Sequence, residues 1–135
     1  MRVLEYDGVK LGVLIQAADR RKGLTFYSEE SDFLQAGIWV YDKHKKLAAH
    51  IHNEVRREID RTQEVIYVEQ GKVKVFIYSE DEKLVEELIL EKGDIAIFLR
   101  GGHGYEILED NTHVLEIKNG PYVGAEKDRR SLKNA

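Results

Sequence analysis

The sequence predicts an all-β protein, because short segments of branched and aromatic residues alternate with polar turns along most of the chain. Residues 65–68 lead through Glu69-Gln70-Gly71 into residues 73–78, which is the pattern of a β-hairpin with glycine in its turn. We expect about nine to eleven strands of this kind, the number typical of a sandwich or a barrel.

The other expected strands follow in chain order and enclose no repeat or linker. They are residues 13–15, 23–27, 37–41, 84–90, 95–99, 105–108 and 114–118. Residues 84–90 contain the helix formers Glu and Leu, but their short length within a meander favours a strand. One helical turn is expected at residues 53–59.

The length of 135 residues predicts a single domain. Within it we expect N-terminal strands in residues 1–35, a barrel core in residues 36–120 and a charged tail in residues 121–135. The tail is expected to be loosely ordered or to lie against a partner.

The composition excludes several classes of function. The net charge of −4 gives no electrostatic support for binding nucleic acid. The absence of cysteine excludes disulfides and thiolate chemistry. No apolar run approaches a membrane span, and the N-terminus does not resemble a signal peptide, so a cytoplasmic protein is expected.

Three of the five histidines can be placed in one constellation with a carboxylate. His50 and His52 would share a face if the chain is extended there, because side chains alternate along a strand. Glu64 follows at the start of a strand, and His103 lies in a glycine-rich turn at residues 101–104. Imidazoles and carboxylates are ligands for divalent transition metals, so these residues predict a metal site.

Other polar residues are candidates for chemistry next to that site. Glu116 and Lys118 share one face of the last strand, either as an exposed pair or as an inward acid–base pair. Tyr67 and Tyr105 are either core aromatics or catalytic groups. The arginines that could bind an anionic group of a substrate are Arg57, Arg61 and Arg100.

These residues resemble the two motifs of the cupin superfamily. The first motif reads His50-Ile51-His52, then Glu64, then Gly71 after six intervening residues. The second runs from Gly93 to His103. The chain departs from the motifs in its eleven-residue gap after His52, in Leu99 at the position of a proline, in a histidine one residue early and in lacking the final asparagine.

The resemblance implies a cupin-type double-stranded β-helix, which is a jelly-roll barrel, and a homodimer. It implies one divalent metal ion (Fe, Mn, Ni or Zn) held by His50, His52, Glu64 and His103. Such a site would act on a small polar molecule, either as a sugar-like isomerase or epimerase or as a dioxygenase.

Two alternatives stay open at this point. The same cavity would serve a non-catalytic cupin that binds or senses a small molecule. A metal-free epimerase of this fold would use a histidine as base and a tyrosine as acid.

Overall fold

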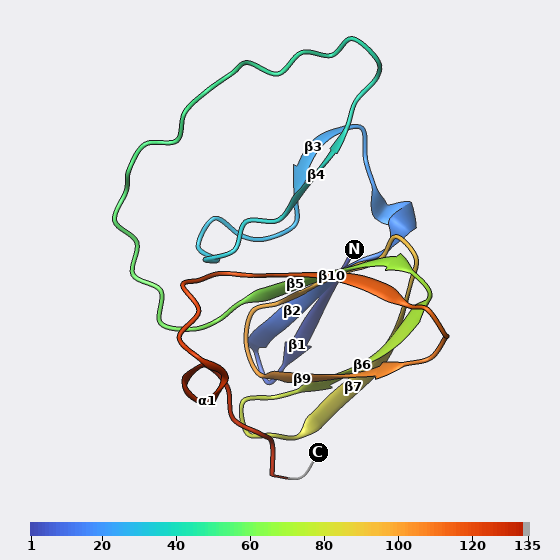
Figure 1. Ribbon diagram of the computed structural model, residues 1–135, viewed down its shortest axis with the longest axis vertical. Coiled ribbons are helices and arrows are strands. Elements are labelled where there is room, and N and C mark those ends of the chain that lie inside the picture. Colours follow the sequence, from blue (N-terminus) through green and yellow to red (C-terminus); the bar gives the residue numbers. More distant parts are fainter. Residues whose placement is uncertain (134–135) are drawn as a thin grey trace.

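Ten strands and two short helical turns make up the computed structural model, which describes residues 1–133 (Figure 1). The strands are β1 (Arg2–Tyr6), β2 (Val9–Ile15), β3 (Gly23–Phe26), β4 (Gly37–Val40), β5 (Glu64–Gln70), β6 (Lys72–Tyr78), β7 (Leu84–Glu91), β8 (Ile95–Phe98), β9 (Gly102–Ile107) and β10 (His113–Lys118). The helical turns are η1 (Ala17–Asp19) and α1 (Ala125–Asp128).

The strands form three antiparallel sheets. The largest sheet has the order β1-β2-β8-β5-β10, the second has the order β7-β6-β9, and β3 and β4 form a separate hairpin. Gly71, with a φ of +80°, joins β5 to β6 and so connects the two larger sheets. The chain therefore passes from one sheet to the other at a residue that tolerates a left-handed backbone.

The main core lies between the two larger sheets. Its buried residues come from both: Leu4, Leu11, Leu14, Ile66, Val68, Val73, Val75, Ile77, Leu88, Leu90, Ala96 and Phe98. A second cluster covers the other face of the large sheet, where Tyr27 packs with Val13, Val65 and Ile97. Residues 34–38 complete this cluster, so the segment before β4 is anchored on the large sheet.

The all-β prediction is confirmed, and residues 84–90 are a strand, as expected. β1 was not anticipated, and together with β2 it belongs to the large sheet instead of forming a separate N-terminal unit. Among residues 1–133, no helix has the length and apolar character needed to cross a membrane.

Two local predictions are wrong. Residues 53–59 form no helical turn, and the chain around His50 and His52 is not a strand. Both lie in segment 41–63, an extended arm that projects away from the sheets (Figure 1). Its charged residues are exposed, and no neighbouring strand is there to pair its backbone, so local alternation alone did not produce a strand.

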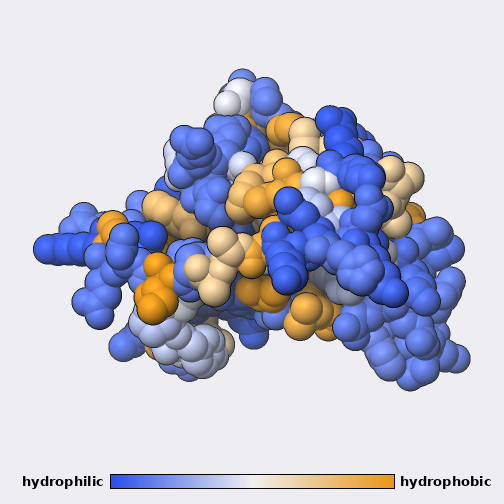
Figure 2. Space-filling model, turned by 90° about the horizontal axis from the view of Figure 1, so that it is seen from above, coloured by the Kyte–Doolittle hydropathy of each residue, from blue (hydrophilic) through white to orange (hydrophobic). Residues whose placement is uncertain are grey.

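β9 and β10 lie at the edges of their sheets and pair on one side only, with β6 and β5 respectively. The described strands therefore do not close into a barrel. Apolar residues at these edges are exposed, as are several on β3, β4 and the arm; among them are Ile107, Leu115, Ile117, Leu24, Phe26, Trp39 and Ile51. Figure 2, which views the molecule from the side of the arm, shows hydrophobic side chains at the surface among hydrophilic ones.

The packing of β7 gives a matched test of the core. Leu90 is fully buried between the sheets, whereas Leu84, on the same strand, is half exposed. We expect Leu90→Ala to lower the free energy of unfolding by about 3 kcal/mol, because it leaves a cavity. Leu84→Ala should change it by less than about 0.5 kcal/mol. Urea denaturation measures both, and equal losses in the two variants would contradict this arrangement.

Candidate functional site

The centre of the site is a buried carboxylate at the first residue of β5. Glu64 is only 3% exposed, yet it stands among polar groups from two other strands. Its Oε1 accepts a hydrogen bond of 2.6 Å from the hydroxyl of Tyr105. Its Oε2 lies 3.1 Å from the ammonium of Lys118 and 3.5 Å from Nε2 of His103.

Strand register brings these groups together. Lys118 lies directly opposite Glu64 on β10, and Phe98 lies opposite it on β8. His103 and Tyr105 are two residues apart on β9, so both point the same way, toward the large sheet. The carboxylate therefore connects the large sheet with the three-stranded sheet.

The electrostatics of Glu64 favour its ionised form. Burial alone would raise its pKa, but hydrogen bonds from His103, Tyr105 and Lys118 outweigh burial and lower the pKa from 4.5 to about 2. Burial of the phenol and the adjacent carboxylate raise the pKa of Tyr105 well above its usual range. The phenol therefore keeps its proton and donates it to Glu64 as a hydrogen bond.

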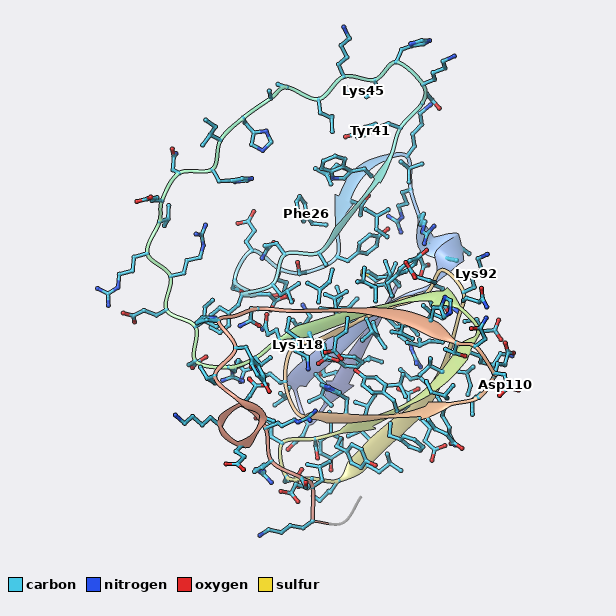
Figure 3. All side chains as sticks on the ribbon, viewed as in Figure 1. Phe26, Tyr41, Lys45, Lys92, Asp110 and Lys118 are labelled. Atoms are coloured by element: carbon cyan, nitrogen blue, oxygen red, sulfur yellow. The ribbon has the colours of Figure 1, made fainter. Side chains whose placement is uncertain are left out.

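Lys118 is shared between two carboxylates. Its ammonium lies 2.9 Å from Glu116 and 3.1 Å from Glu64. The hydrogen bond with Glu116, followed by that with Glu64, outweighs desolvation and raises the pKa of Lys118. Of the two alternatives for Glu116 and Lys118, the structure shows the inward pair, because both line the cavity described next (Figure 3).

The ring of His103 is held in a defined orientation. It stacks on Phe98 with the ring centroids 4.4 Å apart and an interplanar angle of 24°. The turn before it depends on Gly101, which has a φ of +72° and whose Cβ, if present, would lie 2.2 Å from the carbonyl oxygen of Tyr78. No other residue fits there, so the glycine sequence positions His103 at the start of β9.

These groups face a cavity of about 560 Å³, large enough for a small polar molecule. Its walls come from the ends of β5, β6, β8, β9 and β10 and from the C-terminal segment. The lining residues are Arg61, Thr62, Glu64, Ser79, Glu80, Phe98, Leu99, Arg100, Gly101, Gly102, His103, Tyr105, Glu116, Lys118, Asp128, Arg129, Arg130 and Leu132.

The cavity brings together most, but not all, of the residues that the sequence singled out. Arg61 and Arg100 line it, as do Tyr105 and Glu116. Arg57 lies on the exposed arm, where its guanidinium donates to the carbonyl of Val55. Tyr67 lies on the opposite face of β5 from Glu64, three positions along the strand, and does not line the cavity.

His50 and His52 lie outside the cavity, on the exposed arm. Their ring centroids are 5.0 Å apart, and Ile51 between them is 93% exposed. Among residues 1–133, no group of three or more potential metal-binding side chains is assembled. The donor types suit a transition metal, but the four residues stand as two separate pairs, so the four-ligand site stays a prediction.

Sequence reasoning missed the contributions of Phe98, Ser79 and Glu80 and those of the C-terminal segment. Phe98 carried no signal beyond its place in an apolar strand. The dipeptide Arg129-Arg130 was visible as part of the charged tail. Its role in the cavity wall depends on contacts with distant parts of the chain, which local patterns do not report.

Comparison with protein-family models, with curated proteins and with solved structures found no match. The chemistry of the site is therefore argued from its geometry. An ionised carboxylate orients a histidine, a lysine ammonium stands beside it, and arginines line the far wall. This arrangement suits the movement of a proton on a polar ligand next to a stabilising positive charge.

The lowered pKa of Glu64 predicts how stability depends on pH. Because the folded-state pKa lies below 4.5, ionised Glu64 stabilises the fold above about pH 4.5, and this stabilisation is lost as the pH falls toward 2. The gap corresponds to roughly 3 kcal/mol. We expect Glu64→Gln to flatten the loss, and Tyr105→Phe to shift it to higher pH. Urea denaturation from pH 2 to 7 measures this, and a Glu64→Gln curve parallel to the wild type would contradict it.

Proposed function

We propose that the protein is a small-molecule enzyme of the cupin type that moves a proton on carbon next to a carbonyl group, as in isomerisation or epimerisation. The observation that carries this proposal is the contact of His103 with the buried, ionised Glu64 inside a cavity. The cupin assignment is supported by two facing sheets and by Glu64 and His103 standing together, as the two motifs require.

In this reaction, His103 is the base. Its Nε2 faces the carboxylate of Glu64, which favours the tautomer with the proton on Nε2 and leaves Nδ1 free to accept a proton. His103 removes the proton from the carbon next to the carbonyl, and the electron pair of that C–H bond moves onto the carbonyl oxygen as an enolate. Return of the proton to the other face, or to the neighbouring carbon, completes an epimerisation or an isomerisation.

The surrounding residues have separate roles. The ammonium of Lys118 is positioned to stabilise the negative oxygen of the enolate. Glu64 orients His103 and stabilises the imidazolium that forms. Tyr105 is a positioning residue, because its phenol proton is engaged with Glu64 and its raised pKa makes it a poor acid. This assignment differs from a histidine–tyrosine acid–base pair in giving the charge-stabilising role to lysine.

Exchange of carbon-bound hydrogen with solvent tests this mechanism without a known substrate. A panel of small hydroxy-ketones and hydroxy-aldehydes, free and phosphorylated, is incubated with the protein in D₂O and followed by NMR. We expect deuterium to enter next to the carbonyl of at least one compound, with His103→Asn lowering the rate by about 100-fold or more. His113→Asn, on an exposed turn, is the matched control and should leave the rate unchanged.

Two results would count against the enzyme assignment. Exchange that persists in His103→Asn would remove the proposed base. Saturable binding of a compound without any exchange or turnover would favour the non-catalytic binding protein instead.

A metal-centred function is the second candidate, and the paired histidines on the arm favour it. His50 and His52 stand on the segment that leads directly into Glu64, with eleven residues between His52 and Glu64. Eleven residues can span well over 30 Å, so the arm has the length to fold back to the cavity. β9, which carries His103, has a free edge on which such a segment could pair.

Metal binding is tested by elemental analysis of untagged protein and by the change in melting temperature with Fe(II), Mn(II), Ni(II) or Zn(II). If this candidate holds, one equivalent of metal should bind, and His52→Ala should weaken binding by about 10-fold or more. His44→Ala, on the same arm, is the control and should bind normally. Exchange activity that survives complete chelation would decide for the metal-free mechanism.

The homodimer expected for this fold remains part of the proposal. It is supported by the exposed apolar residues of β3, β4 and the arm, which a second copy would cover. A sedimentation mass of one chain would overturn it.

A further inference from the structure

The C-terminal segment, residues 124–133, forms one wall of the cavity. It contains α1 and continues past the start of β9 (Figure 1). The hydroxyl of Thr62 donates to Asp128 at one end of the segment. At the other end, the guanidinium of Arg130 and the backbone N–H of Lys133 both contact Glu82, in the turn between β6 and β7.

The cavity has an excess of positive charge where this segment meets the sheets. Four guanidinium groups line that end, from Arg61, Arg100, Arg129 and Arg130, against the carboxylates of Glu80 and Asp128. Glu80 is shared by Arg61 at 3.6 Å and Arg100 at 4.0 Å, which are long contacts. Arg129 is paired with no carboxylate of residues 1–133. This local excess contrasts with the net charge of −4 for the whole chain.

We propose that this arginine-lined end binds an anionic group of the ligand, a phosphate or a carboxylate, and that segment 124–133 is a movable wall of the binding site. The inference rests on the proposed function in so far as the ligand occupies the same cavity. It adds the class of ligand, an anionic small molecule, and assigns a binding role to Arg129.

The chemistry of the guanidinium group supports an anion. Its planar donors match the oxygens of a phosphate or a carboxylate in pairs, and such charged hydrogen bonds are about twice as strong as neutral ones. Arg61 and Arg100 stand on the body of the protein, beside β5 and β8, whereas Arg129 stands on the segment. An anion between them would therefore join the segment to the body.

The contacts of the segment are those of a part that can move. Its charged contacts lie at the surface, where each contributes little. Its main apolar contact is Leu132, which lies over Gly102 at a distance that leaves no room for a Cβ there. A second cavity of about 590 Å³ lies beside it, next to Tyr78 and Gly104, and Tyr122 and Val123 before it are exposed.

Binding of pyrophosphate, followed by calorimetry at low salt, tests the anion site. We expect saturable binding that weakens as salt rises and that Arg129→Gln weakens by about tenfold. Lys127→Gln removes a neighbouring positive charge that does not line the cavity, and it should bind like the wild type. Malonate in place of pyrophosphate shows whether a carboxylate serves as well as a phosphate.

Hydrogen exchange by mass spectrometry tests the movable wall in the same samples. Amides of residues 125–133 should exchange quickly in the free protein and at least several-fold more slowly with pyrophosphate bound. Glu82→Gln should speed exchange in the free protein, because it removes the contact with Arg130, whereas Glu86→Gln, which loses an ion pair with Arg2, should not.

Several outcomes would overturn the proposal: no saturable binding of either anion, equal loss of binding in Arg129→Gln and Lys127→Gln, or exchange of residues 125–133 that is unaffected by bound anion. Failure of the proposed function is separate. His103→Asn should abolish deuterium exchange into substrates while leaving pyrophosphate binding intact, so either hypothesis can fail alone.

Discussion

The buried carboxylate of Glu64 is the constraint on which the site depends. A charge in the interior is costly unless hydrogen bonds and opposite charges surround it, and here Tyr105, Lys118 and His103 offset that cost. Because the partners come from β9 and β10, the two larger sheets must meet in one register. A shift of β5 by one residue would turn Glu64 to the opposite face and leave all three partners without it.

The position of Glu64 also explains why the site lies at the end of the sheets. β5 runs between β8 and β10, and its inward residues beyond Glu64, namely Ile66 and Val68, belong to the apolar core. The strand thus passes from core to site within one residue pair. Phe98, opposite Glu64 on β8, closes the core on one side and supports the ring of His103 on the other.

The sequence predicted what depends on short patterns and missed what depends on distant contacts. The hairpin at Gly71 and the strand nature of residues 84–90 follow from local composition and turn residues. The joining of Glu64 with His103 was predicted from residue type. The alternation of His50 and His52 indicated a strand, but a strand needs a neighbour, and the charged arm has none among the described residues. The cavity wall at Leu132 arises from contact with Gly102, thirty positions earlier, which no local pattern contains.

The two proposed chemistries make opposite demands on one oxygen atom. Oε2 of Glu64 receives the ammonium of Lys118 at 3.1 Å, and the same atom would have to face a metal ion in a four-ligand site. Two positive charges cannot share that position without strong repulsion, so a metal ion would displace Lys118. Glu116 already holds the ammonium at 2.9 Å and would retain it after such a displacement. The occupancy of Oε2, by lysine or by metal, therefore determines which chemistry the cavity supports.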